Sequence, residues 1–184
     1  FQGNVNLVTL NVSSFNFLNL KYASTMFADL SKLENLIVGN FKTSTKLVAI
    51  SYMFAGIGLY SLDLTDMVTD NVTGASYMFN NSKLTEIDMS SCNFGKVTDV
   101  TNMLNNCTNL TMFKAPYGKP SLEITLPDGT WKNLNNINAT VGTTILSKID
   151  GTNTLYLEYN NNSIKLDLGF GENVTAYYEK NNRN

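Results

Sequence analysis

The chain has 184 residues, 43% of them hydrophobic, with 13 basic side chains, 15 acidic side chains and no histidine. Its length suits one or two small domains, and its formal net charge of −2 lacks the basic excess of a nucleic-acid-binding protein. The lack of histidine excludes Ser-His-Asp and Cys-His catalysis and every zinc site with histidine ligands. No apolar run reaches the roughly 18 residues that span a bilayer, so we expect no membrane insertion.

The chain begins with Phe1-Gln2-Gly3, which is how a common protease-cleavable purification tag ends. We therefore interpret residues 1–3 as a tag remnant and leave them out of the fold prediction. A chain that begins in this way is expected to be a fragment of a longer protein. We accordingly expect any anchor to lie outside it.

An internal repeat organises residues 4–115. The pattern Leu-x-x-Leu-x-apolar first occurs at Leu7, Leu10 and Val12, and its last two apolar positions alternate as in a strand with one buried side. Its five copies start at Leu7, Leu33, Leu59, Leu84 and Leu110, so they are 26, 26, 25 and 26 residues apart. This regular spacing indicates a repeat protein.

A second apolar pattern alternates with the first. Leu20, Ala23, Met26 and Phe27 have the spacing i, i+3, i+6 and i+7, which places all four side chains on one face of a helix. We therefore predict a helix of one to two turns in each repeat, with the repeated Met-Phe pairs in the core. The equivalent sets are Leu47/Ile50/Met53/Phe54, Val72/Ala75/Met78/Phe79 and Val97/Val100/Met103/Leu104.

No single unit of this kind can bury its apolar face, so consecutive units must stack. Strands about 4.8 Å apart would then form a parallel sheet with the helices on the opposite side. The predicted fold class is α/β: a solenoid of about five coils of 25–26 residues over residues 4–115, each with a short strand and a short helix.

Two sequence motifs resemble a known repeat family. They are Leu62-Asp63-Leu64-Thr65-Asp66 with the following Asn71-Val72-Thr73, and Ser-Tyr-Met-Phe at residues 51–54 and 76–79. Together they are similar to the BspA-like leucine-rich repeat of bacterial cell-surface proteins, over roughly residues 5–115. The resemblance implies a right-handed leucine-rich-repeat solenoid outside the cell, often used for adhesion.

The periodicity ends at Ala115, and two prolines in residues 116–120 mark a boundary. Alternating apolar residues at 122–126, 155–159 and 164–168 indicate strands, and residues 160–162 read as the turn of a hairpin between the last two. A further strand is expected within residues 174–178. We predict that residues 116–184 form a small antiparallel β module that caps the open end of the solenoid.

Cys92 and Cys107 are the only cysteines. Each replaces an apolar residue of a neighbouring repeat, so we expect two buried thiols that behave as small hydrophobic side chains. They flank one predicted helix, which should hold them too far apart for a disulfide. No further cysteine or histidine exists to complete a four-ligand metal site.

The exposed face of the predicted sheet carries the candidate partner-binding residues. Asp63 and Asp88 should be direct neighbours across strands, with Glu86 diagonal to Asp63, and like charges that face each other cost stability. A repeated acidic position can therefore indicate a partner or a cation. The alternative is a solvated face on which Lys114 relieves part of the repulsion. The candidates are Asn35, Ile37, Asp63, Glu86 and Asp88.

We predict no catalytic, cofactor or metal site. Carboxylates about 5–5.5 Å apart occur in retaining glycosidases. However, stacked carboxylates on an open sheet lack the pocket and the desolvation that raise the pKa of one of them.

The resemblance and the exposed sheet favour a segment of a bacterial cell-surface protein. It would bind an extracellular or host protein through residues displayed on a rigid repeat surface. One alternative is a structural spacer in a surface protein. Another is a carbohydrate-binding module around Trp131, which burial of Trp131 would exclude. The sequence leaves the ligand and the oligomeric state open.

Overall fold

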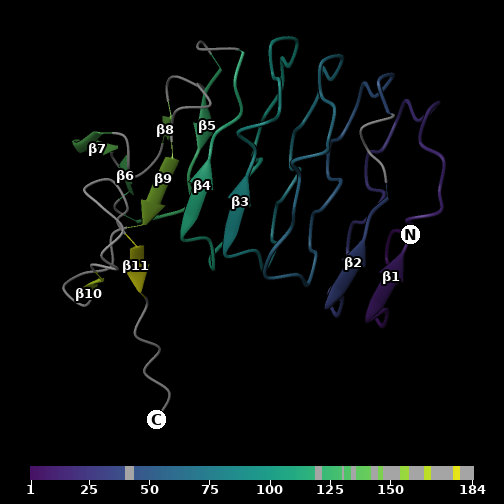
Figure 1. The fold of residues 1–184 in the computed structure, drawn as a ribbon, viewed down its shortest axis with the longest axis horizontal. Helices are drawn as coiled ribbons and strands as arrows, with labels where there is room; N and C mark the ends of the chain where they lie inside the picture. The colour runs from purple at the N-terminus through teal and green to yellow at the C-terminus, as the bar shows by residue number, and fades with distance from the viewer. Residues whose placement is uncertain are drawn as a thin grey trace.

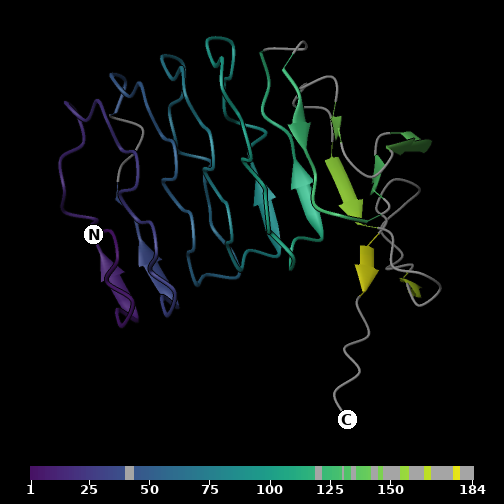
Figure 2. The same cartoon turned by 180° about the vertical axis from the view of Figure 1, so that it is seen from behind.

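The structure is a computed structural model that describes residues 1–39, 44–118, 122–129, 131–133, 136–141, 145–146, 154–157, 164–166 and 176–178. Most of the described residues of the repeats lie in turns and irregular segments. Figures 1 and 2 show successive repeats side by side, from the N-terminus at one end to the later strands at the other. Within the described ranges, nothing helical has the length and apolarity that a membrane crossing requires.

The strands are short, and those of the repeats pair in parallel. β1 (Thr9–Asn11) pairs with β2 (Asn35–Ile37), and β3 (Glu86–Asp88) pairs with β4 (Met112–Lys114). The remaining strands are β5 (Ile124–Thr125), β6 (Trp131–Asn133), β7 (Asn136–Val141), β8 (Ile145–Leu146), β9 (Thr154–Leu157), β10 (Ile164–Leu166) and β11 (Ala176–Tyr178).

The predicted α/β leucine-rich-repeat solenoid, with a helix in every coil, is wrong. The described residues contain no helix, and the segments with helical spacing are chains of overlapping turns. In the second repeat, the N–H of Met53 donates to the carbonyl of Ile50 at 3.1 Å. The donor lies three residues after the acceptor, as in a β-turn. Tyr52 has a φ of 57° and Gly56 a φ of 64°, and residues in this left-handed region interrupt a right-handed helix.

The hydrogen bonds that a helix would form internally run between repeats instead. The N–H of Phe27 donates to the carbonyl of Met53 at 3.0 Å, and the N–H of Phe54 donates to the carbonyl of Met78 at 2.9 Å. These bonds, and parallel bridges that join Tyr22, Ala49, Gly74 and Asp99 in succession, connect neighbouring repeats. Paired backbone groups compensate for the left-handed residues, each of which costs roughly 1–2 kcal/mol.

The core lies between the turns and the strands. Phe27, Phe54 and Phe79 are fully buried and stack in a column, with ring centroids 5.6 Å and 5.9 Å apart. The predicted burial of the Met-Phe pairs is confirmed for Met53/Phe54 and Met78/Phe79, because all four side chains are inaccessible to solvent.

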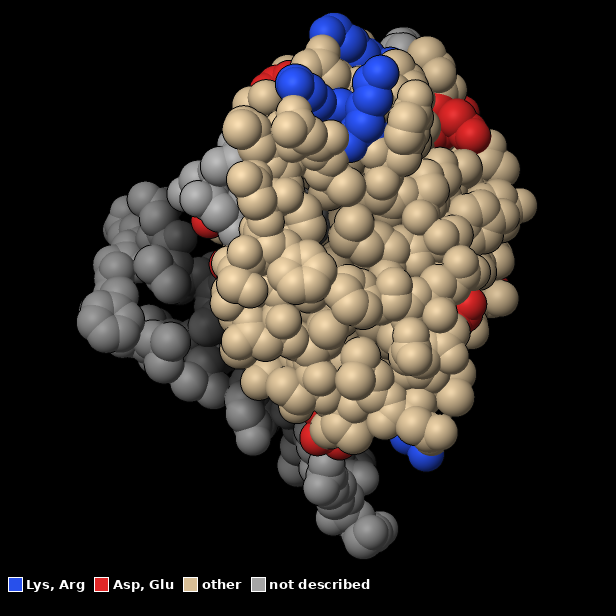
Figure 3. All heavy atoms as spheres, turned by 90° about the vertical axis from the view of Figure 1, so that its right-hand side faces the viewer, with Lys and Arg blue, Asp and Glu red and all other residues tan. Residues whose placement is uncertain are grey.

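The first repeat forms an end face that carries few charges. Phe1 stacks on Phe27 at 5.9 Å, and the N–H of Gly3 donates to the carbonyl of Ala28 at 3.0 Å. Residues 1–3 thus lie where a preceding repeat would place its phenylalanine, while their origin in a tag stays a prediction. Figure 3 shows a mostly uncharged surface at this end of the molecule. Its apolar character agrees with the exposed side chains of Val5, Val8, Phe15, Leu18 and Tyr22.

The strands after residue 120 pair antiparallel, and one of them continues the sheet of the repeats. β9 pairs with β4 on one side and with β6 on the other, in a five-stranded sheet of order β3-β4-β9-β6-β7. The edge of β4 is therefore covered. The predicted hairpin between residues 155–159 and 164–168 is wrong, because β10 pairs with β11 instead. The proposed hairpin turn at residues 160–162 lies outside the described residues, and the division after Ala115 stays a prediction.

Candidate functional site

The parallel sheet of the repeats is interrupted at the third repeat. β1 and β2 form a two-stranded sheet, and β3 begins a separate sheet, so residues 61–63 between them belong to no strand. Between β1 and β2 the backbone groups are paired; for example, the N–H of Val12 donates to the carbonyl of Ile37 at 2.9 Å. Within the described part of the chain, no backbone hydrogen bond joins β2 to residues 61–63. The edge of β2 that faces the third repeat is therefore unpaired.

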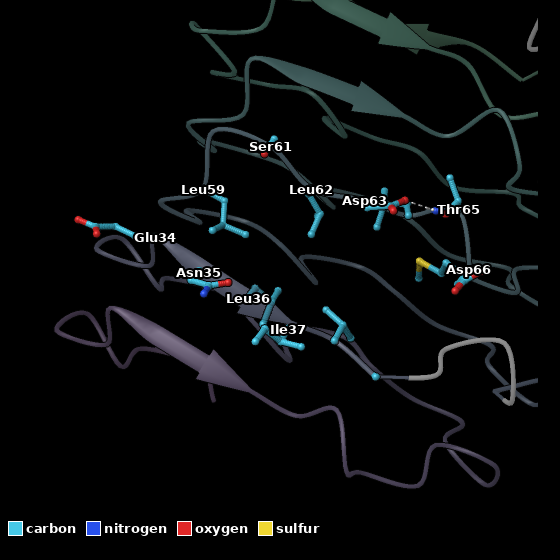
Figure 4. A pocket seen from close by; sticks show the side chains of 14 residues that line it. Glu34, Asn35, Leu36, Ile37, Leu59, Ser61, Leu62, Asp63, Thr65 and Asp66 are labelled. Atoms are coloured by element: carbon cyan, nitrogen blue, oxygen red, sulfur yellow. Dashed lines mark hydrogen bonds between the residues drawn. The ribbon is translucent and has the colours of Figure 1, made fainter.

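A groove of about 410 Å³ lies along this interruption. Figure 4 shows it between β2 and the segment that follows Leu59. Its apolar floor includes Leu36 and Leu62, which are only half-buried, whereas the equivalent residues of the next repeats, Ile87 and Phe113, are 2% and 0% exposed. The missing strand pairing thus opens the inner apolar layer of the sheet to solvent. The groove is lined by residues 34–39, 59 and 61–67.

The polar part of the groove is acidic. Glu34, Asp63 and Asp66 line it, and the lining residues that the structure describes include neither lysine nor arginine. The Thr65 N–H donates to Asp63 Oδ1 at 2.9 Å, and this hydrogen bond holds the pKa of the Asp63 carboxyl below its usual value. At neutral pH Asp63 therefore carries its negative charge.

The sequence-predicted residues divide between this groove and the next strand. Asn35, Ile37 and Asp63 line the groove, and each is exposed. Glu86 and Asp88 lie on β3, outside the groove lining. Asp63 and Asp88 are not paired across adjacent strands as predicted, because residue 63 lies in no strand, although the charge of Asp88 still acts on the Asp63 carboxyl.

Asp88 is already satisfied by its own chain. Its Oδ2 accepts a hydrogen bond from Lys114 Nζ at 2.6 Å, and its Oδ1 accepts one from Ser90 Oγ at 2.6 Å. Partial burial works to raise the pKa of Asp88, but the hydrogen bonds from Lys114 and Ser90 outweigh it and the pKa is lowered. Lys114 thus neutralises part of the charge of Asp88, as expected if this face is only solvated and binds no partner. Asp88 is therefore a weaker candidate for partner contact than Asp63.

Sequence reasoning missed Glu34, Asp66 and the half-buried leucines of the groove floor. Nothing in the repeat pattern identifies them, because the third repeat keeps its apolar positions at Leu59, Leu62 and Leu64. The groove follows from hydrogen bonds that the third repeat does not form. Among the described residues, no group of three or more cysteine, aspartate or glutamate side chains is arranged to hold a metal ion.

Trp131 offers no surface for a sugar ring. Its side chain is fully buried, and its Nε1–H donates to the carbonyl of Pro127 at 2.9 Å. This burial removes the carbohydrate-binding alternative that was built on Trp131. The structure does not describe the side chains of four tyrosines that follow Trp131 in the sequence, namely Tyr156, Tyr159, Tyr177 and Tyr178.

The prediction of two free, buried cysteines is confirmed. Cys92 and Cys107 are both 0% exposed and form no disulfide. Cys107 Sγ donates to the carbonyl of Phe79 at 3.1 Å. Burial raises the pKa of the Cys92 thiol to about 12, and burial raises the pKa of Cys107 as well. Neither thiol has the lowered pKa of a reactive cysteine.

We expect both thiols to resist a thiol-reactive reagent in the native protein at pH 8 and to react on unfolding. Between the pKa of an unfolded cysteine, about 8.5, and the folded value of about 12 for Cys92, only the unfolded state loses its proton. The free energy of unfolding should therefore fall as the pH rises above about 9. Denaturant titrations at pH 8 and pH 10 measure this, and Cys92→Ala should reduce the difference between them. An equal difference in the variant would contradict the assignment to Cys92.

The comparisons with known proteins give a family for most of the chain. Residues 1–114 match the family described as "Mycoplasma protein of unknown function, DUF285". A search of curated proteins and a search of solved structures each found no match.

Proposed function

The chain belongs to the DUF285 family of Mycoplasma proteins of unknown function, and from the geometry of its groove we propose that it binds an extracellular protein. The observation that carries the proposal is the interruption at residues 61–63, which leaves an unpaired strand edge beside an apolar floor. Native proteins usually cover such edges because they pair readily with other chains. An edge left open beside a groove favours a role in recognition.

The setting that we propose for this recognition is the surface of a bacterial cell. The similarity of the repeat motifs to BspA-like surface repeats supports this location. A spacer would need only the stack of repeats and would have no use for the groove. Binding through the groove therefore distinguishes the recognition function from a spacer.

The rigidity of the surface supports its use in binding. Backbone hydrogen bonds to β1 hold β2, and the buried side chains of Leu59 and Leu64 anchor the third repeat in the core. A surface that is ordered before binding loses little conformational entropy when a partner docks.

A triple variant, Asn35→Ala, Ile37→Ala and Asp63→Ala, tests the proposal. The chain is first screened against extracellular-matrix and plasma proteins by a surface-binding assay, and each partner is then titrated with the variant. We expect binding to weaken at least about tenfold, which corresponds to about 1.4 kcal/mol. All three side chains are exposed, so the fold should be retained.

The matched control is Glu86→Ala, an exposed residue of β3 outside the groove. Its affinity for the partner should equal that of the unmodified chain. If the triple variant bound every partner as tightly as this control, the groove would not be the binding surface.

A further inference from the structure

The proposed function leaves the occupant of the groove unspecified, and the backbone of β2 restricts it. The N–H of Asn35 donates to the carbonyl of Val8 at 3.2 Å, and the carbonyl of Ile37 accepts from Val12 at 2.9 Å. In a parallel pair the backbone groups of alternate residues point to opposite sides of the strand. The N–H and C=O of Leu36 therefore point away from β1, toward the groove, and no described group pairs with them.

An extended peptide can satisfy these two groups by lying alongside β2. Main-chain hydrogen bonds to a free strand edge are an established mode of peptide recognition, in which alternate side chains enter pockets of the receptor. The groove volume of about 410 Å³ lies within the range of known ligand sites, about 300–1,000 Å³.

The charge of the groove selects the side chains of that peptide. Figure 4 shows Glu34 at one end of the groove and Asp63 and Asp66 toward the other. The described residues of the lining include no lysine or arginine that would neutralise Glu34 and Asp63. A lysine or arginine can lay its aliphatic stem on Leu36 or Leu62 and bring its cation to a carboxylate. An acidic segment, or the phosphates of a nucleic acid, would be repelled.

We propose, building on the proposed protein-binding function, that the groove takes an extended, lysine- or arginine-bearing segment of the partner that pairs with the free edge of β2. The backbone of Leu36 supplies the hydrogen bonds. The leucine floor takes the aliphatic stems, and Glu34 and Asp63 take the charges.

Synthetic peptides titrated onto the intact chain by fluorescence anisotropy test the proposal. The probes are a labelled peptide of alternating lysine and valine, its glutamate–valine counterpart, and two lysine–valine peptides N-methylated at alternate amides in opposite registers. We expect the lysine–valine peptide to bind, more weakly as salt increases, and the glutamate–valine peptide not to bind. N-methylation in one register should weaken binding at least about tenfold, and in the other register it should have little effect, because only one side of a strand pairs with β2.

The double variant Glu34→Gln with Asp63→Asn should weaken binding of the lysine–valine peptide, whereas the control Glu86→Gln on β3 should not. Equal binding of the basic and acidic peptides, or equal effects of N-methylation in both registers, would overturn the proposal. Binding of an anionic oligosaccharide at the groove in place of the basic peptide would also overturn it.

The two functional claims fail separately. If the triple groove variant loses binding to a protein partner but no basic peptide binds the unmodified chain, the proposal of an extended basic segment is wrong and the protein-binding function stands. If the basic peptide binds in the expected register but protein partners bind the triple variant unchanged, the groove is a peptide site that those partners do not use.

Discussion

Replacing Phe54 by alanine is expected to lower the free energy of unfolding by about 3–5 kcal/mol. Phe54 is fully buried in the middle of the aromatic column, with Phe27 at 5.6 Å on one side and Phe79 at 5.9 Å on the other. Its removal leaves a cavity that the flanking repeats can close only by shifting their backbones, which hydrogen bonds between repeats hold in place. Domains of this size are stable by only about 5–15 kcal/mol, so the loss is a large fraction of the total.

Urea titration followed by circular dichroism measures this effect, and the midpoint should fall while the slope is unchanged. Phe15→Ala is the matched control, because the Phe15 side chain is 49% exposed on the first repeat. We expect less than about 1 kcal/mol for this control. Equal losses in the two variants would show that the column does not carry the stability of the stack.

Replacing Gly58 by alanine should also destabilise the protein, by about 1–3 kcal/mol. A Cβ at residue 58 would lie 2.5 Å from the carbonyl oxygen of Ser31 and 3.0 Å from the backbone nitrogen of Leu33. Both are backbone atoms of the preceding repeat and cannot move aside as a side chain can. The backbone at residue 58 would therefore have to move away from the preceding repeat. That shift would strain the hydrogen bond from the Gly58 N–H to the carbonyl of Leu30, at 3.0 Å.

Gly74→Ala is the control for this prediction. The nearest atom to a Cβ at residue 74 is Ser51 Oγ at 3.4 Å, which is ordinary van der Waals contact. We expect Gly74→Ala to be neutral or to stabilise the protein by up to about 1 kcal/mol, because alanine restricts the unfolded chain. Thermal unfolding of the two variants separates them, and a Gly58→Ala variant as stable as Gly74→Ala would contradict the tight approach of the repeats.

The row of candidate contact residues was partly predictable. Alternation along each repeat was enough to place Asn35, Ile37 and Asp63 outward, because a residue directly next to an inward leucine points to the opposite face of the strand. It could not distinguish Asp63 from Asp88. That difference depends on Lys114, 26 residues later, whose Nζ lies 2.6 Å from Asp88 Oδ2.

The groove itself depends on hydrogen bonds that side-chain patterns do not encode. Residues 35–38 and 61–64 both carry aliphatic residues at their two inward positions, yet β2 forms a strand and residues 61–63 do not. The pairing of two short strands depends on the separation and register of their backbones. Both are set by how the neighbouring repeats pack.

The sequence by itself determined the period of the repeat and the identity of the core. An apolar residue that returns once in every repeat, here after 27 and then 25 positions, must face the same way each time, so Phe27, Phe54 and Phe79 were predictably buried together. Only the tertiary structure decided the backbone conformation between those residues. Turns that carry a left-handed residue every fourth position present the same inward side chains as a helix, but they direct their N–H and C=O groups toward the adjacent repeats. That arrangement is stable only when a neighbouring repeat supplies the partners. A helix pairs these groups within one segment, so spacing alone could not distinguish the two conformations.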